Sequence, residues 1–364
     1  MFKYIKLAAL ALLFSVGFTA CEDDEDYSYT DNGQPSYDSS EAYALIQGNM
    51  SGGVGGAIDK LMISENGAAS VKKDYFALTN NQQLGDNPQE GLLYGSKIYV
   101  SVQQSDILWV LDAESLEIIR QIKMSQPTAL CATKGYVFAT NYDGHVTRVD
   151  TFRLEEPAKT LAVGPNPDGI AAYNNKVYVT ISDGMNYENG YANGKKVVEL
   201  NAETFTQTKS YEVGLNPGQI VTNKIGELFL VSRGNYANVL PTVQKITLQG
   251  EVIDYEPGSM IATDGDMLYI LDSQTDWTTG ASEVTIKRFN MTDDNLEEHF
   301  IAEKDMPAAP TNLSVHPGTH DLYICSDKSA FGYAESGWVY QYNYGGKLLN
   351  RFNVGIHPYD VIFK

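Results

Sequence analysis

Residues 163–180, VGPNPDGIAAYNNKVYVT, decide the fold. This stretch holds a glycine-proline turn, a short apolar run, an Asn-Asn turn and a run in which β-branched and aromatic residues alternate with others. Proline, glycine and asparagine mark turns, and a period of two is typical of β-strands. The stretch therefore predicts two strands joined by a tight turn, and similar stretches occur elsewhere in the chain.

The same unit recurs along the sequence. Each of the first six copies in chain order continues into an alternating run such as YVFATN, then a third run such as HVTRVD, and then a fourth that leads to the next turn. Four strands per unit, at a period of about 40 to 50 residues, indicate the blades of a β-propeller. The copies begin at Pro88, Pro127, Pro167, Pro217, Pro310 and Pro358, and one copy without proline begins at Gly258.

The two ends of the repeat complete one blade. The copy at Pro358 supplies one strand, and the N-terminal runs AYALIQGN, GAIDKLMISE and DYFALTN supply three. We therefore predict an all-β, seven-bladed β-propeller over residues 41–364, with four antiparallel strands per blade and no open edge at the seam. A β-sandwich is the alternative, but it does not explain the constant four-strand period. No long helix is expected, and DDNLEEHF is expected to form a turn or two at most.

Residues 1–20 have the pattern of a bacterial lipoprotein signal peptide. Lys3 and Lys6 precede an apolar run, and small residues stand directly before Cys21. We expect Cys21 to be the lipidated first residue of the mature chain; an ordinary secretory signal with an incidental cysteine is the alternative. Residues 21–40 are acidic and then rich in Ser, Asp, Tyr and Pro, which predicts a flexible tether. The acidic run resembles the surface-export signal of Bacteroidetes lipoproteins, and a plain solvated tether explains it equally well.

Composition disfavours several functions. The formal net charge of -20 argues against nucleic-acid binding and against contact with anionic lipid head groups. Cys131 and Cys325 lie in apolar runs far apart, which predicts buried free thiols. His316 and His320 form H-x-x-x-H across a turn and not on a helix, so we expect no metal site. No catalytic residue and no cofactor is predicted, because no phosphate-binding glycine loop and no G-x-S-x-G motif occurs.

One face of the predicted ring carries long loops, such as SDGMNYENGYANGK and SRGNYANVLP, whereas the opposite turns are short. Variable long loops mark a working face. Rigid aromatic residues mixed with hydrogen-bonding groups suit a large amphipathic ligand or a protein surface. The alternative is that the aromatic residues pack over neighbouring blades and the polar residues hold water. Asp360 is expected near the axis on the same face. The expected ligand-binding residues are Tyr187, Tyr191, Tyr236, Trp277, Phe331, Tyr333, Gln126, Asn166, Asp168, Asn216, Gln219, Asn312, His357 and Tyr359.

The repeats carry a family resemblance. The segments YVFATNYDGHVTRVD, VGPNPDGIAAYNNKVYVT and VVELNAETFTQTKSYEVGLNPGQI are similar to YVTN, or YncE-like, propeller repeats, over nearly all of the expected mature chain. Together with the lipoprotein signal, the chain resembles the BtuG cobalamin-binding lipoproteins. The resemblance implies an outer-membrane, surface-exposed lipoprotein that captures cobalamin and related corrinoids. It also implies a TonB-dependent outer-membrane transporter as the partner that receives them, with cobalamin as cargo and not as a catalytic cofactor.

Two other functions stay open at the level of sequence. A surface-layer or adhesion-type scaffold that binds protein or glycan fits the aromatic loops nearly as well. An enzyme, such as a propeller lyase or a quinoprotein, needs a convergent acid–base pair, and His357 alone is a plausible member of one. We therefore expect a binding protein and not an enzyme.

Overall fold

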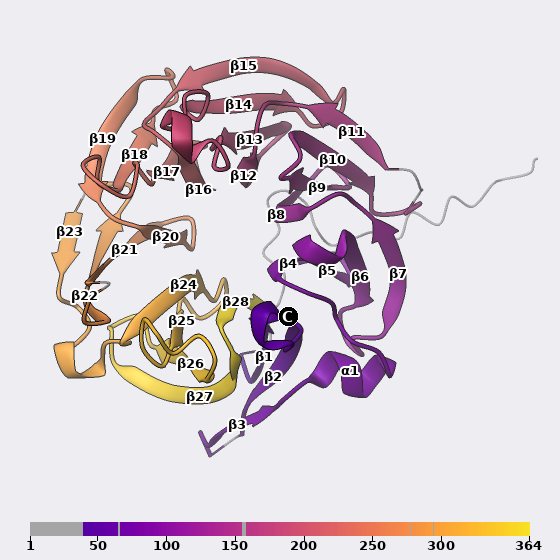
Figure 1. Ribbon diagram of the computed structural model, residues 1–364, viewed down its shortest axis with the longest axis vertical. Coiled ribbons are helices and arrows are strands. Elements are labelled where there is room, and N and C mark those ends of the chain that lie inside the picture. Colours follow the sequence, from indigo (N-terminus) through magenta and orange to yellow (C-terminus); the bar gives the residue numbers. More distant parts are fainter. Residues whose placement is uncertain (1–38, 65, 155–157, 277, 294) are drawn as a thin grey trace, which may run out of the picture.

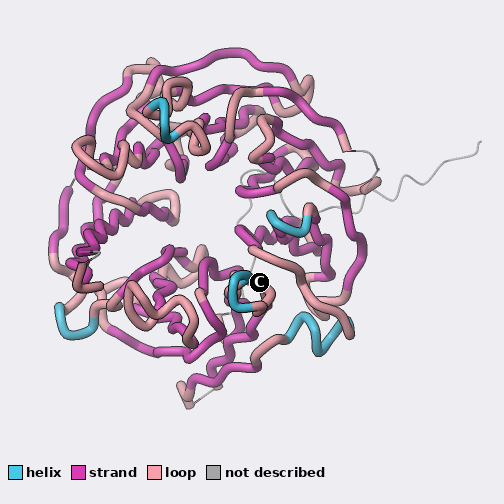
Figure 2. The backbone as a smooth tube through the Cα atoms, viewed as in Figure 1, coloured by secondary structure: helices cyan, strands magenta, loops and turns pink. Residues whose placement is uncertain are grey.

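Seven four-stranded antiparallel sheets form a ring in the computed structural model (Figure 1). The structure describes residues 39–64, 66–154, 158–276, 278–293 and 295–364. Strands dominate these residues, and helices are few and short (Figure 2). The predicted seven-bladed β-propeller is confirmed. The expected signal peptide, Cys21, residues 21–38 of the expected tether and Trp277 lie outside the described residues.

One blade, here called the seam blade, joins the two ends of the described chain. Its innermost strand is β28 (Pro358–Phe363), followed outward by β1 (Glu41–Ile46), β2 (Ala57–Ile63) and β3 (Ala69–Lys72). Strand β28 pairs antiparallel with β1 from Ala42 opposite Phe363 to Ile46 opposite Pro358. The predicted closure by N- and C-terminal strands is therefore confirmed.

One local expectation is wrong. The run DYFALTN, expected as the outer strand of the seam blade, is the helix α1 (Tyr75–Asn80), and the outer strand is β3. Phe76 of this helix is buried against the Trp109 ring, with ring centroids 5.5 Å apart. Six residues are too few for a period of 3.6 to be told from a period of two. The run DDNLEEHF, for which at most a turn or two was expected, contains the strand β23 (Asn295–Glu298) and no helix in its described residues.

The other six blades follow in chain order, each from its innermost to its outermost strand. The innermost strands are β4 (Pro88–Tyr94), β8 (Pro127–Thr133), β12 (Pro167–Tyr173), β16 (Pro217–Thr222), β20 (Met260–Thr263) and β24 (Ala309–Val315). The second strands are β5 (Lys97–Val102), β9 (Tyr136–Asn141), β13 (Lys176–Ile181), β17 (Leu228–Ser232), β21 (Met267–Asp276) and β25 (Leu322–Asp327).

The third strands are β6 (Ile107–Asp112), β10 (His145–Asp150), β14 (Lys196–Asn201), β18 (Thr242–Ile246), β22 (Ala281–Asn290) and β26 (Ser336–Tyr342). The remaining outermost strands are β7 (Ile118–Lys123), β11 (Lys159–Ala162), β15 (Thr206–Glu212), β19 (Val252–Pro257) and β27 (Leu348–Ile356). In the described part of the chain, four 3-10 helices lie in connections: η1 (Met50–Gly52), η2 (Gln103–Ser105), η3 (Tyr187–Asn189) and η4 (Glu303–Asp305).

The hydrophobic core lies between neighbouring blades. Tyr99 and Val110 of one blade, for example, pack in one buried cluster with Leu130 and Val137 of the next. Full burial of such a side chain contributes about 1.5 to 3 kcal/mol. Cys131 and Cys325 are buried free thiols within these layers, as the sequence predicts.

Hydroxyl side chains tie four consecutive inner strands, β4, β8, β12 and β16, together. Each of β4, β8 and β12 has a register shift just after its proline, and such a bulge leaves a backbone N–H without a ladder partner. Thr140 Oγ1 accepts from the N–H of Ala129 (3.0 Å) and donates to the carbonyl of Asp168 (2.7 Å) on the next inner strand. Ser101 makes the same pair of contacts with Glu90 N–H and Thr128 O, and Thr180 with Gly169 N–H and Gly218 O. These contacts fix the residues that follow each proline around the axis.

Candidate functional site

The two faces of the ring differ in their connections. Because the strands are antiparallel, the connections between second and third strands lie on the same face as the turns that lead into the inner strands. We call this the loop face. It carries the long segments 182–195, 233–241 and 328–335, whereas the opposite face carries short turns between first and second strands.

A cavity of about 270 Å³ lies on the axis and is lined by residues from all seven inner strands and by Arg233. We call it the axial cavity. Its lining includes five of the predicted residues, namely Asp168, Gln219, Asn312, Tyr359 and Asp360. The lining also includes Gln89, Glu90, Thr128 and Arg233, which were not predicted from the sequence.

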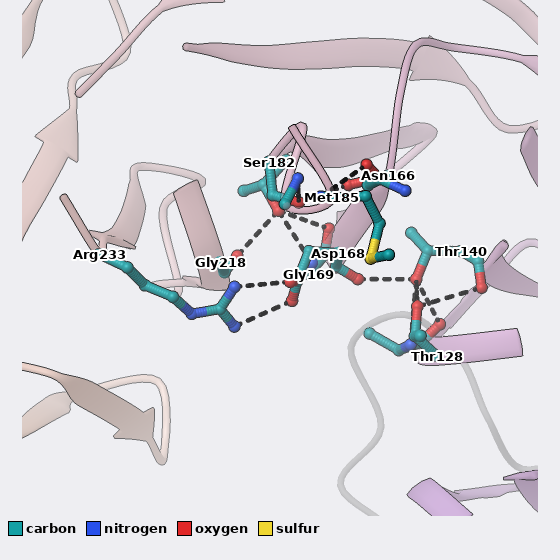
Figure 3. A network of polar contacts seen from close by, with 12 residues as sticks. Thr128, Thr140, Asn166, Asp168, Gly169, Ser182, Met185, Gly218 and Arg233 are labelled. Carbon is teal, nitrogen blue, oxygen red and sulfur yellow. Dashed lines mark hydrogen bonds and ion pairs between the residues drawn. The ribbon is translucent and has the colours of Figure 1, made fainter. Parts of the chain in front are cut away.

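Arg233 and Asp168 form a two-point ion pair at this cavity (Figure 3). Arg233 Nη1 lies 2.6 Å from Asp168 Oδ2, and Nη2 lies 3.1 Å from Oδ1. The guanidinium also lies close to Gly218, where an added Cβ would stand 2.3 Å from Arg233 Cζ. Burial opposes the charge of Arg233, but the Asp168 carboxylate outweighs it and holds the pKa of the guanidinium above its usual range. This position is therefore charged at any physiological pH.

Two carboxyl groups, Glu90 on β4 and Asp360 on β28, line the same cavity. Burial raises the pKa of Glu90 well above its usual value, and the neighbouring Asp360 carboxylate raises it further. Burial also raises the pKa of Asp360, although hydrogen bonds from Gly91, Val361 and Ser314 oppose this. The pair therefore retains protons at a pH at which exposed carboxyl groups have lost them.

Two amide side chains meet on another part of the lining. Gln219 Nε2 donates to Asn312 Oδ1 (2.7 Å), and Gln219 Oε1 accepts from the backbone N–H of Ile261 (3.0 Å). Tyr359 also lines the cavity. Burial raises the pKa of its hydroxyl to about 12, so the hydroxyl stays neutral. The cavity thus offers hydrogen-bond donors, acceptors and two carboxyl groups without a cationic partner in its described lining.

Four further predicted residues, Gln126, Asn166, Asn216 and His357, stand directly before a proline and have positive φ angles of 41°, 47°, 55° and 56°. Their backbone carbonyls accept hydrogen bonds from the residue that follows the second strand, as in Tyr142 N–H to Gln126 O (3.0 Å). Asparagine tolerates this left-handed conformation better than most residues. Their polar character therefore has a structural cause in the turn, and none of them lines the axial cavity.

The predicted aromatic residues lie in the loops of the loop face, with different exposure. Tyr187 is 63% and Tyr236 is 71% exposed, and Phe331 and Tyr333 are also exposed. Tyr191 is buried and packs edge-to-face on Tyr236, with ring centroids 6.4 Å apart. This contact joins two neighbouring loops. Further exposed apolar residues, which were not predicted, lie on the same face: Met185, Val239 and Leu240 in these loops, and Met50 and Val54 in segment 47–56.

The histidine pair does not converge on a shared site. His316 is buried and its Nδ1 accepts from the N–H groups of Gly318 and Thr319, whereas His320 Nδ1 contacts Asp264 Oδ2 at 2.9 Å. Within the described residues no group of three or more His, Cys, Asp or Glu side chains is placed to hold a metal ion. No helix in this part of the chain is long and apolar enough to cross a membrane.

A second hollow, of about 1100 Å³, lies between the β21–β22 hairpin and the segment 299–307. The tip of this hairpin packs on the loop face, since an added Cβ at Gly280 would stand 2.5 Å from the Phe331 ring. This second hollow lies in a different blade from the Arg233–Asp168 ion pair and shares no lining residue with the axial cavity.

The fold and site define a seven-bladed propeller with a polar axial cavity and an apolar, aromatic loop face. Residues 61–363 match the family described as "Domain of unknown function (DUF5074)", and the chain belongs to that family. No curated protein sequence matches the chain.

Solved structures share the fold at low sequence identity. A quinoprotein alcohol dehydrogenase-like protein from Bacteroides thetaiotaomicron is 15% identical, with a TM-score of 0.59, and the match covers 89% of this chain and 78% of that one. Hydrazine synthase from Kuenenia stuttgartiensis is 15% identical, with a TM-score of 0.54 and 68% and 74% coverage. The Pan2 WD40 domain of Neurospora crassa is 8% identical, with a TM-score of 0.54 and 75% and 80% coverage. These likenesses concern the fold alone.

Proposed function

We propose that this protein captures cobalamin and related corrinoids on its loop face. The observation that carries the proposal is the combination of exposed aromatic and apolar side chains in neighbouring loops with amide groups at the axis. A corrinoid presents flat apolar surface together with many amide side chains. Tyrosine, methionine and amide side chains match both parts of such a ligand, because they supply apolar area and adaptable hydrogen bonds.

The proposed role is binding and delivery without chemical change to the ligand. The expected lipoprotein signal at Cys21 and the acidic residues after it support an address on the outer surface of the outer membrane. A protein tethered there is well placed to hand its ligand to a TonB-dependent transporter in the same membrane, and we propose such a transporter as the partner.

Calorimetry with cyanocobalamin tests the ligand. We expect saturable binding with one ligand per chain, and an affinity that changes little with salt, because the corrin ring has few charges for an acidic protein to attract. Cobinamide, a corrinoid without the lower nucleotide, should also bind. Haemin serves as the control for any flat apolar macrocycle and should bind much more weakly.

The absence of cyanocobalamin binding would overturn the proposal. The exposed loop residues would then favour the alternative of a scaffold that binds protein or glycan. The address is tested separately by fractionation: Cys21→Ala should leave a soluble or unprocessed protein. A processed, membrane-bound form of that variant would contradict the lipoprotein assignment and leave the ligand assignment standing.

A further inference from the structure

The axial cavity contains negative charge that corrinoid capture on the loops does not use. Glu90 and Asp360 lie on the neighbouring inner strands β4 and β28 and line the cavity together. Arg233 is the only Lys, Arg or His side chain in the described lining, and it is engaged by Asp168 at two points. The two carboxyl groups therefore have no cation within the cavity.

Backbone hydrogen bonds hold both carboxyl groups in place. Asp360 Oδ1 accepts from its neighbour Val361 N–H (2.8 Å) and from Ser314 Oγ (3.1 Å), and Oδ2 accepts from Gly91 N–H (3.0 Å). Glu90 Oε2 accepts from Leu130 N–H (3.1 Å). A carboxyl group fixed in this way is preorganised to accept from a ligand.

We propose that the axial cavity binds an alkylammonium group, with the carboxylates of Glu90 and Asp360 as its acceptors. An ammonium group supplies three N–H donors and one positive charge, which matches two carboxyl groups without a cation. Away from bulk water such a charge-assisted pair is stronger than at the surface. A divalent metal ion is a poorer match, because hard cations take six or more oxygen ligands and this part of the cavity offers two carboxylates.

The rest of the cavity suits a short alkyl chain. Ile170, Ile220 and Leu313 lie in its lining, next to the polar groups. The cavity volume of about 270 Å³ admits a small organic molecule. The ligand class is therefore an amphipathic primary amine with a short hydrocarbon chain, and its binding does not depend on corrinoid capture.

Binding should be coupled to the release of a proton. Besides burial, the Asp360 carboxylate and the N–H of Leu130 act on Glu90. Glu90 in turn raises the pKa of Cys131 on β8 and of Tyr359, and Arg233 and Asp168 lie at the same cavity. Burial and the like charge of Asp360 raise the pKa of Glu90, so the empty pair holds a proton that an ammonium group displaces. Affinity should therefore rise as pH increases through the raised pKa, while an alkylamine stays protonated up to about pH 10.

Calorimetry with n-butylammonium on the full chain tests the proposal, and 1-butanol is the neutral control of the same shape. Wild-type protein should bind the ammonium at about pH 8 and bind the alcohol at least about tenfold more weakly. Glu90→Gln keeps the shape and removes the charge, and should weaken ammonium binding by about tenfold or more. Glu114→Gln removes the same charge from a side chain that is 91% exposed, and should leave affinity within about twofold.

Three results would overturn the proposal: no ammonium binding by the wild-type protein, equal binding of the alcohol, or unchanged affinity in Glu90→Gln. If Glu90→Gln does not fold, the wild-type protein still decides the matter. Its affinity for n-butylammonium should fall by about tenfold or more as pH is lowered through the raised pKa of Glu90 toward the usual value of 4.5, and a flat profile contradicts the proposal. Neither result bears on cyanocobalamin binding, so the two assignments fail separately.

Discussion

Arg233 donates two hydrogen bonds to the Asp168 carboxylate, of 2.6 Å and 3.1 Å, and so joins two neighbouring blades at the axis. Arg233 follows β17 and Asp168 lies on β12, 65 positions away in the sequence. Gly218 makes this approach possible, because a side chain at that position would collide with the guanidinium. Figure 3 shows how these residues meet the hydroxyl contacts of Thr128 and Thr140.

Replacement of Arg233 by alanine should destabilise the protein. The change leaves the Asp168 carboxylate without its partner, and both side chains are only about a quarter exposed (27% and 25%). We expect a loss of about 1 to 3 kcal/mol in the free energy of unfolding, between the values for exposed and fully buried pairs. Arg233→Lys should recover only part of it, since lysine cannot form the two-point contact.

Urea denaturation of the variants provides the measurement, and the exposed ion pair Lys328–Glu335 provides the control. Lys328→Ala should change the free energy of unfolding by about 0.5 kcal/mol or less. Equal effects of Arg233→Ala and Lys328→Ala would show that the ion pair at the axis contributes no more to the free energy of unfolding than an exposed pair.

The pair Glu90 and Asp360 should make stability depend on pH. Burial raises the pKa of Glu90 above its usual value of 4.5 in the folded state, so the folded protein holds a proton that the unfolded chain releases. The stabilising contribution of this proton is complete below pH 4.5 and is lost as pH rises through the raised pKa. Glu90→Gln cannot release a proton, so the difference in unfolding free energy between variant and wild type should shift in favour of the variant as pH rises.

Urea denaturation across this range checks the prediction, with Glu114→Gln as the control that removes an exposed carboxyl group. The difference for the control should stay flat with pH. A difference for Glu90→Gln that also stays flat would mean that Glu90 titrates alike in the folded and unfolded states.

The repeat, the number of blades and the seam were predictable because each rests on local patterning. A proline turn followed by an alternating run reports on its own strand pair, and the period counts the blades. Short runs are harder to assign. DYFALTN forms α1, and the contact that buries its Phe76 against Trp109 is tertiary, so it leaves no local pattern in the sequence. Neither the composition nor the spacing of six residues reports on that contact.

The site was predictable in part. The residues after each proline were placed at the axis correctly for Asp168, Gln219 and Asn312. The residues before each proline, such as Asn166, are better explained by their positive φ angles. Arg233 and Glu90 were missed, because their partners come from other blades and only the closed ring brings them together. A lone arginine at a strand end in so acidic a chain, which has 46 acidic and 26 basic residues, was the available signal.

Deletion of residues 358–364 should open the ring. It removes β28, which pairs with β1 along its length and buries Val361 and Phe363. The exposed inner edge of β1 can then pair with another chain. We expect lower cooperativity in thermal unfolding and aggregation in size-exclusion chromatography.

Deletion of Lys364 alone is the matched control, because β28 ends at Phe363. That shorter deletion removes the ion pairs of Lys364 with Glu41 and Glu114 and should leave the protein monodisperse. A protein without residues 358–364 that melts like the full chain would contradict the role of β28 in closure.

Tyr187 and Tyr236 should be anchors for the corrinoid on the loop face. Both are among the most exposed aromatic side chains of the described residues, at 63% and 71%, and they lie in adjacent loops joined by the Tyr191–Tyr236 contact. An exposed tyrosine in a preformed loop gives contact area at a small entropic cost, so each alanine variant should weaken cyanocobalamin binding by about 1 to 4 kcal/mol. The loss should appear mainly as faster release, measured by surface plasmon resonance, because variants of one interface differ chiefly in dissociation rate.

Phe152→Ala is the control, since this phenylalanine is 62% exposed in the connection after β10, on the opposite face. Dissociation that is unchanged in both tyrosine variants, or as fast in Phe152→Ala as in them, would place the ligand away from these loops.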